Sequence, residues 1–232
     1  MDEPITPKDV LAQVAQAIPE ALPGTADTPD ALLAVVRLQP PHRSPWFLEL
    51  LGAPASVVPP PHANGKSSNR LQTRGGHFAL PSFAYLGLAQ FQPTVSEFGI
   101  RIALPEMMAL ANLLHHTVIG EAVMSQPFAG RSIKRANKDL GRVVAMAFLV
   151  DQQNEDALEG WMTTWRNALM ELAPSDVDRL LALAPSGLTA LLGSAADIEQ
   201  ALHSVNYGLL SATPLSPTQF AIALRRLLQA LG

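Results

Sequence analysis

The sequence predicts an α+β protein in which a small mixed α/β part, residues 1–104, precedes a helical bundle, residues 105–232. Short runs rich in β-branched and aromatic residues before Pro105 are typical of strands. After Pro105, amphipathic segments are bounded by Pro, Gly or Ser, as helices prefer. Hydrophobic residues make up 48% of the chain and charged residues 16%, which is enough apolar material for a substantial core.

The composition and the N-terminal residues indicate the cellular compartment in which we expect the protein. A formal net charge of -4 gives no bulk attraction to nucleic acid or anionic lipid, and 0 Cys excludes disulfides and thiolate metal sites. The chain starts MDEPITPKDV, with acidic residues where a signal peptide would carry Lys or Arg. Its most apolar later run, residues 143–150, is far shorter than the ~20 residues of a membrane span. We expect a cytoplasmic protein without a membrane segment.

The first part is expected to combine one helix with several short strands. Apolar residues at helical spacing predict a helix over 6–18, and AVVRLQ and WFLELLG predict two strands. Residues 53–76 are dense in Pro, Gly, Ser and Asn, which indicates an exposed loop. Two further strands are expected in HFALP and EFGIRIALP, with a short helix capped by Ser82 between them.

The second part is expected to be helical to the end of the sequence. Pro105 opens the first helix and Ser132 opens a long second one. Trp161 and Trp165 are four residues apart on one helical face, so we expect them in the core or at an interface. Further helices are predicted at 155–172, 175–183, 195–206 and 216–231.

Two segments of the helical part carry a resemblance to a known family. The first is PEMMALANLLHHTVIG, and the second, after a short spacer, is GRSIKRANKDLGRVVAMAFL. They resemble the helical region of bacterial nucleotidyltransferase-fold proteins of the abortive-infection toxin type. In that region a proline-initiated helix is followed by a basic stretch that ends in Lys-Asp-Leu. The order of elements resembles the family over residues 28–231.

The resemblance implies that Lys134, Lys138 and Asp139 help to hold a nucleotide. Lys134 and Lys138 are one helical turn apart, where two ammonium groups could meet a triphosphate. Asp139 points about 100° away from Lys138 on a helix, so we expect it to fix Arg135 or Arg142, or to cap a neighbouring element. A solvated basic helix face is the alternative interpretation.

The catalytic segment of that family is not found in this sequence. The family's enzymes place Gly-Ser at a helix start and an Asp-x-Asp pair on a strand, where two carboxylates hold Mg²⁺. Asp27 and Asp30 in GTADTPD are the nearest match, but Pro29 and the turn composition prevent strand alternation. We interpret this stretch as a turn and N-cap and predict no metal site there. A segment looks missing, either naturally or by truncation.

Glu49 is the candidate for a catalytic carboxylate. It lies in the predicted strand WFLELLG, where the family's third metal-ligating acid would stand, and a buried carboxylate needs a partner. Without the other two acids it could not organise a catalytic magnesium. Pairing with Arg37 on the neighbouring strand is the structural alternative, and we favour it.

His115 and His116 are adjacent near the end of the first helix. Adjacent helical residues point in different directions, whereas helical metal pairs need i, i+4 spacing. We therefore expect them to interact with the helix dipole rather than with a metal. Asn112 stands where the family is expected to have a lysine, which weakens the case for phosphate binding.

The sequence favours a nucleotidyltransferase-family protein that lacks catalytic competence by itself and keeps a nucleotide-binding helical half. Mg²⁺ and a nucleoside triphosphate are implied only if the transferase resemblance holds. The alternative is a non-enzymatic interaction or regulatory module, in which the basic helix meets an acidic protein surface. A working transferase that draws its acids from Asp27, Asp30 and Glu49 is the third hypothesis.

Overall fold

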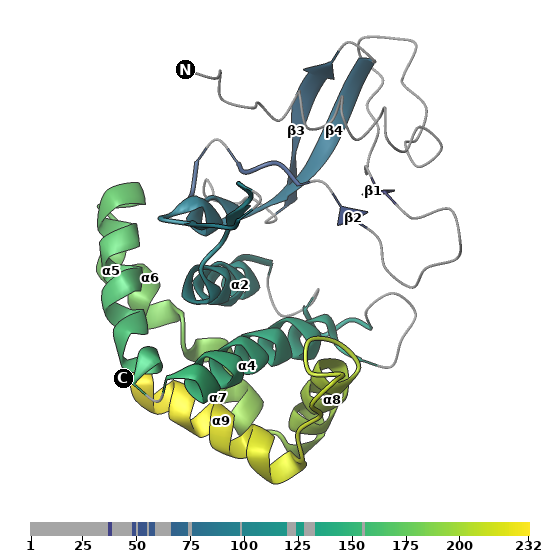
Figure 1. Ribbon diagram of the computed structural model, residues 1–232, viewed down its shortest axis with the longest axis vertical. Coiled ribbons are helices and arrows are strands. Elements are labelled where there is room, and N and C mark those ends of the chain that lie inside the picture. Colours follow the sequence, from purple (N-terminus) through teal and green to yellow (C-terminus); the bar gives the residue numbers. More distant parts are fainter. Residues whose placement is uncertain are drawn as a thin grey trace. The chain divides into compact units, whose positions relative to one another are not determined.

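The computed structural model describes residues 37–38, 48–49, 51–54, 56–58, 66–73, 76–97, 99–119, 124–127, 133–154 and 156–232. These residues are mostly helical, with small two-stranded antiparallel sheets (Figure 1). They divide into two compact units. The first unit contains strands β1 to β4, and the second contains residues 56–58 and everything described from Ala84 to Gly232. The helical unit therefore begins earlier than Pro105, where the sequence placed the boundary.

The first unit contains the two short strands that the sequence predicted. Strand β1, Arg37–Leu38, pairs antiparallel with β2, Leu48–Glu49. In this register Arg37 lies opposite Glu49 and Leu38 lies opposite Leu48. The predicted helix at 6–18 lies outside the described residues.

A longer hairpin in the first unit corrects part of the predicted loop. Strand β3, Lys66–Thr73, pairs with β4, Gly76–Phe83, along the whole length of both strands. The strand expected at HFALP is confirmed, but KSSNRLQT was assigned to the exposed loop at 53–76. Its polar composition hides the strand, because a hairpin strand gains its hydrogen bonds from its partner and needs no continuous apolar face. Only two positions separate the strands in the sequence, the spacing of a tight hairpin.

In the helical unit, a 3₁₀ helix and a small hairpin precede the first α-helix that the structure describes. A 3₁₀ helix, η2 (Leu86–Gln90), precedes the small hairpin of β5 (Thr94–Val95) and β6 (Arg101–Ile102). Ser82, expected to cap a helix, instead belongs to β4. The residue before η2 is the buried Tyr85, whose φ of 65° is uncommon for a residue with a side chain.

Helix α2, Pro105–Ile119, forms the centre of this unit. Met107, Leu110 and Leu114 on this helix are fully buried, and so are most of the residues between them. A helix that is apolar on nearly all sides must be enclosed by other elements. Helices α4, α5, α6 and α7 and the η2 segment pack around it.

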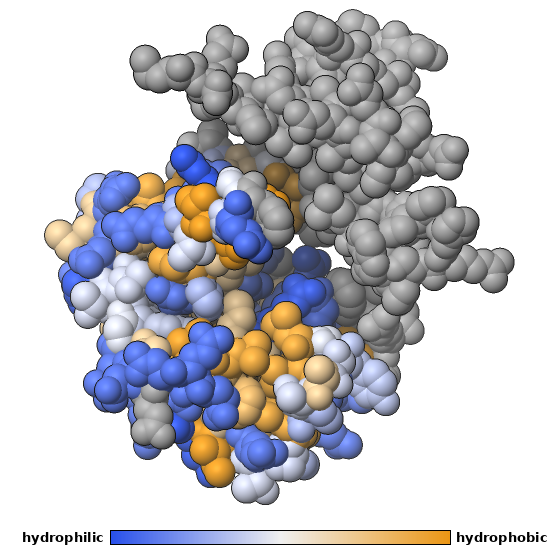
Figure 2. Space-filling view, viewed as in Figure 1, coloured by the Kyte–Doolittle hydropathy of each residue, from blue (hydrophilic) through white to orange (hydrophobic). Residues whose placement is uncertain are grey.

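Helix α4, Arg135–Gln153, connects α2 to the C-terminal helices. It is the long helix that the sequence placed after Ser132, and it begins at Arg135 with Lys134 as its N-cap. It packs against α2, α8 and α9. Figure 2 shows apolar side chains gathered over the region of α4 on the face drawn there.

One 3₁₀ helix and five α-helices follow α4 in the described part of the unit, and two tryptophans join α5 to α2. Trp161 and Trp165 are both buried, with ring centroids 5.9 Å apart, and Trp165 Nε1 donates to the Glu106 carbonyl oxygen at 2.8 Å. Their predicted place in the core is confirmed. The elements are η3 (Ala157–Gly160), α5 (Trp161–Leu172), α6 (Val177–Leu183), α7 (Ser186–Leu192), α8 (Ala195–Asn206) and α9 (Pro217–Ala230).

No single helix among the described residues has both the length and the apolar character needed to cross a membrane. Two stretches meet that requirement only when they are counted together as one helix, and they are bent by 103° relative to each other: Val177–Leu192 and Ala195–Asn206.

The close approach of α4 and α8 predicts that Gly141→Ala destabilises the protein. A Cβ at Gly141 would lie 2.9 Å from the Ala201 carbonyl oxygen, which belongs to the backbone and cannot rotate away. Overpacking of this kind costs about 1–3 kcal/mol. Thermal denaturation should show a melting temperature lowered by about 2–4 °C for each kcal/mol.

Gly160→Ala is the matched control, because a Cβ there meets nothing within 4 Å. Its melting temperature should stay close to that of the parent protein. Equal melting temperatures for the two variants would contradict the proposed close contact between α4 and α8.

Candidate functional site

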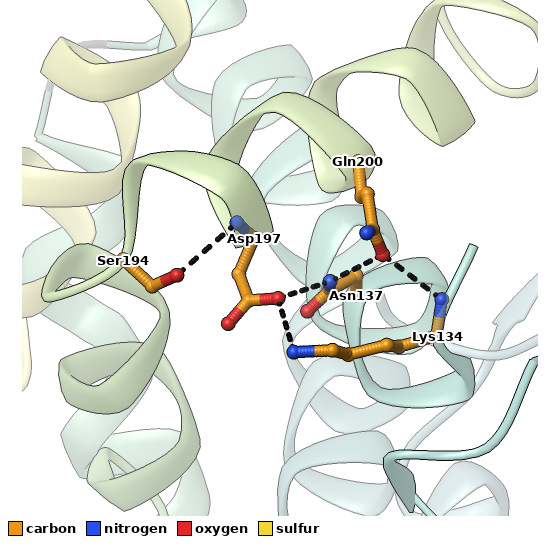
Figure 3. Close-up of polar contacts among 5 residues, drawn as sticks. All are labelled: Lys134, Asn137, Ser194, Asp197 and Gln200. Carbon is orange, nitrogen blue, oxygen red and sulfur yellow. Dashed lines mark hydrogen bonds and ion pairs between the residues drawn. The ribbon is translucent and has the colours of Figure 1, made fainter. Parts of the chain in front are cut away.

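Lys134 is held by a carboxylate of a distant helix. Its Nζ lies 2.7 Å from Oδ1 of Asp197, which stands in the first turn of α8 (Figure 3). Hydrogen bonds donated by Lys134 and Asn137 lower the pKa of Asp197 below its usual range. Because Asp197 is already near the positive end of α8, its charge is stabilised by the helix dipole as well as by Lys134.

The contact between Lys134 and Asp197 belongs to a larger network between α4 and α8. The buried Asn137 donates through Nδ2 to Asp197 Oδ1 at 2.8 Å and to Gln200 Oε1 at 2.9 Å. The backbone N–H of Lys134 also donates to Gln200 Oε1, at 3.0 Å, and Ser194 Oγ accepts from the Asp197 N–H at 3.3 Å. Figure 3 shows these side chains of the two helices pointing toward one another. Buried polar groups need such partners, so the network stabilises the helix pair.

Lys138 and Asp139 form a second polar group on the same helix. Lys138 Nζ lies 3.4 Å from Asp139 Oδ1, and Arg135 Nε lies 3.9 Å from Asp139 Oδ2. The side chains of Asp139 and Lys138 are both largely buried, with exposed fractions of 12% and 19%. Burial lowers the pKa of Lys138, and the neighbouring Asp139 opposes this shift.

Two of the predicted nucleotide-binding residues, Lys134 and Lys138, direct their ammonium groups to different carboxylates. Lys134 and Lys138 are one turn apart, since the Lys138 N–H donates to the Lys134 carbonyl oxygen at 3.2 Å. Their ammonium groups nevertheless face different carboxylates, Asp197 on α8 and Asp139 on α4. The expectation that Asp139 contacts Arg135 is met by the 3.9 Å ion pair, but Asp139 also contacts Lys138.

Two histidines of α2 lie next to this second group. His115 is buried, and burial lowers its pKa to about 4, while Asp139 opposes the shift and Arg135 adds to it. Burial likewise lowers the pKa of His116. Asn112, in place of the expected lysine, donates through Nδ2 to the Met108 carbonyl oxygen of its own helix at 2.7 Å.

The candidate catalytic and metal-ligating acids are not assembled in the described part of the chain. Glu49 lies opposite Arg37 in the β1–β2 ladder, the register that the ion-pair alternative requires. Asp27 and Asp30 lie outside the described residues. Within the described ranges, no three His, Asp or Glu residues are grouped so that they could hold a metal ion.

Comparison with known proteins gives no relative for this chain. It matches no protein-family model, and no curated protein or solved structure is significantly similar to it.

Sequence reasoning missed the residues of α8 that face α4. Asp197 and Gln200 are sixty or more positions away from Lys134 and Asn137, so no local spacing connects them. The signal that could have indicated a role was Ser194 followed by an acidic residue three positions later, which is typical of a helix start. It predicts the cap, but not the partner across the interface.

The buried His115 predicts a loss of stability at acidic pH. Its pKa in the folded protein is about 4 and its ordinary value is 6.5, so the unfolded chain binds the proton first as the pH falls. The stability contributed by the neutral imidazole is complete above pH 6.5 and is lost as the pH falls toward 4, by roughly 2–3 kcal/mol.

Denaturant titrations of the parent and His115→Gln at several pH values test this expectation. The variant should lose less stability than the parent between pH 6.5 and pH 4. Parallel curves for the two proteins would show that His115 does not carry this pH dependence.

Proposed function

We propose that this chain is a nucleotidyltransferase-family protein that does not transfer nucleotides by itself and binds the phosphates of a nucleotide at Arg135 and Lys138. The main support is the close placement of two cations on one helix. Arg135 and Lys138 both contact Asp139, and the buried Nε of Arg135 has no hydrogen-bond partner among the described residues.

An anion between Arg135 and Lys138 would be attracted by both cations. Two cations held close together on one helix repel each other, and partial burial reduces the screening by water. Burial lowers the pKa of Lys138, although the neighbouring Asp139 opposes the shift. Phosphate oxygens accept strong charge-assisted hydrogen bonds from both guanidinium and ammonium groups.

Lys134 has a different role in this proposal from the one that the sequence suggested. Its ammonium group is bonded to Asp197, and its backbone N–H is bonded to Gln200. If the ammonium group of Lys134 bound a ligand instead, the carboxylate of Asp197 would lose its ion-pair partner. Lys134 therefore positions α4 against α8, and Arg135 takes its place among the phosphate-binding residues.

The described residues do not fit a catalytic magnesium, because no group of three potential ligands is present among them. We therefore propose no metal-dependent step. Nucleotide binding by the cations alone is sufficient for a regulatory role and requires no transfer chemistry.

Titration calorimetry with ATP, GTP and inorganic triphosphate tests the proposal. Each charge-assisted contact contributes ~1.5–3 kcal/mol, so replacing both Arg135 and Lys138 with Ala should weaken binding at least tenfold. Lys134→Ala is the matched control on the same helix. It should lower the melting temperature but leave the affinity for triphosphate within a small factor.

No detectable binding by the parent protein at millimolar ligand would contradict the proposal. So would a loss of binding in Lys134→Ala that equals the loss in the double variant, provided that circular dichroism shows both variants to be folded.

The alternative function is a non-enzymatic interaction module. It is favoured by one observation, that Lys134 and Lys138 each already have a carboxylate partner within the chain. In this case the exposed Arg142 and its basic neighbours on α4 would contact an acidic protein surface, and calorimetry would detect no nucleotide.

A further inference from the structure

The connection between α8 and α9 exposes large side chains that ordinarily avoid water. Tyr207 is 79% exposed and Leu209 is 55% exposed, and Ile222 on the following helix is 50% exposed. Figure 1 shows this connection on the opposite side of the helical unit from α5. Exposed aromatic and aliphatic residues close together in sequence often mark a contact surface.

The connection is fixed in place although its side chains are exposed. Leu210 and Leu215 are buried on either side of the exposed residues 211–214. The side chain of Asn206 holds Leu215 from both directions, because its Nδ2 donates to the Leu215 carbonyl oxygen and its Oδ1 accepts from the Leu215 N–H, both at 2.9 Å. A segment that is ordered before binding loses little entropy when it forms an interface.

Tyr207 is also held by its neighbour. Its ring lies 4.4 Å from the ring of His203, between centroids, at an interplanar angle of 44°. This contact orders an aromatic side chain that is otherwise surrounded by solvent. Rigid exposed tyrosines are enriched among the residues that dominate interface energies.

The charge pattern identifies the kind of partner. From Gln200 to Leu224 the sequence contains no Asp, Glu, Lys or Arg, although charged residues make up 16% of the chain. A two-fold interface places the same patch of both subunits face to face, so a charged patch would meet its own sign. An uncharged patch avoids this repulsion. It offers no attraction to nucleic acid, anionic lipid or a charged protein surface.

We propose that the surface formed by Tyr207 and Leu209 in the α8–α9 connection is a self-association site, at which a second copy of this chain binds in a two-fold dimer. The proposal does not depend on nucleotide binding, because Arg135 and Lys138 belong to α4. The dimer buries the apolar side chains of the α8–α9 connection against their counterparts in the other copy.

Sedimentation velocity of the full chain over a range of concentrations tests the proposal. The parent should show a monomer–dimer equilibrium. Leu209→Glu should weaken dimerisation at least tenfold, because the symmetry brings the two introduced carboxylates together. Leu209→Lys should do the same by the same mechanism. Met170→Glu, an exposed apolar position on α5, is the matched control and should dimerise like the parent.

A mixture of the Leu209→Glu and Leu209→Lys proteins should form a mixed dimer, since the introduced charges are then opposite. Restored association of two folded but monomeric variants is a result that a purely structural role for Leu209 does not produce. A parent protein that stays monomeric at every concentration would overturn the proposal. Dimerisation that Leu209→Glu leaves unchanged, or that Met170→Glu disrupts equally, would overturn it as well.

Discussion

Helix α4 is fixed to the C-terminal helices by an ion pair near each of its ends, and the geometry of the candidate site depends on this. At its N-terminal end Lys134 Nζ lies 2.7 Å from Asp197 Oδ1 of α8. Near its C-terminal end Asp151 Oδ1 lies 2.8 Å from Arg226 Nη2 of α9. Between them Gly141 allows the backbone of α8 to approach closely. The position of α4 is therefore set by contacts that are distant in sequence.

This arrangement divides the basic residues of α4 between two roles. Lys134 contributes to the interface with α8, because its side chain and its backbone both bond to that helix. Arg135 and Lys138 lie instead beside Asp139 and the buried histidine of α2. The side chain of Lys138 is only 19% exposed. The proposed anion site rests on the second group, whereas the contacts of Lys134 join two helices.

The sequence predicted the elements whose signals are local. The spacing and the Ser216–Gln219 capping box of α9 are both readable from consecutive residues, and so is the core position of Trp165. The sequence did not predict α7, because Pro185, Ser186 and Gly187 at its start are residues typical of turns. It could not predict that Lys134 would bond to Asp197, since only the packing of α4 against α8 brings them together. The adjacency of Lys138 and Asp139 was visible, but their shared burial with Arg135 was not.

A double-mutant cycle on Lys134 and Asp197 tests most directly whether Lys134 stabilises the fold rather than binding the nucleotide. The free energy of unfolding would be measured by denaturant titration for the parent, Lys134→Ala, Asp197→Ala and the double variant. A partly exposed ion pair within a hydrogen-bonded network should give a coupling energy of about 0.5–1 kcal/mol. A coupling energy near zero, together with a loss of triphosphate binding in Lys134→Ala, would contradict the structural role of Lys134. It would indicate instead that Lys134 binds the phosphates.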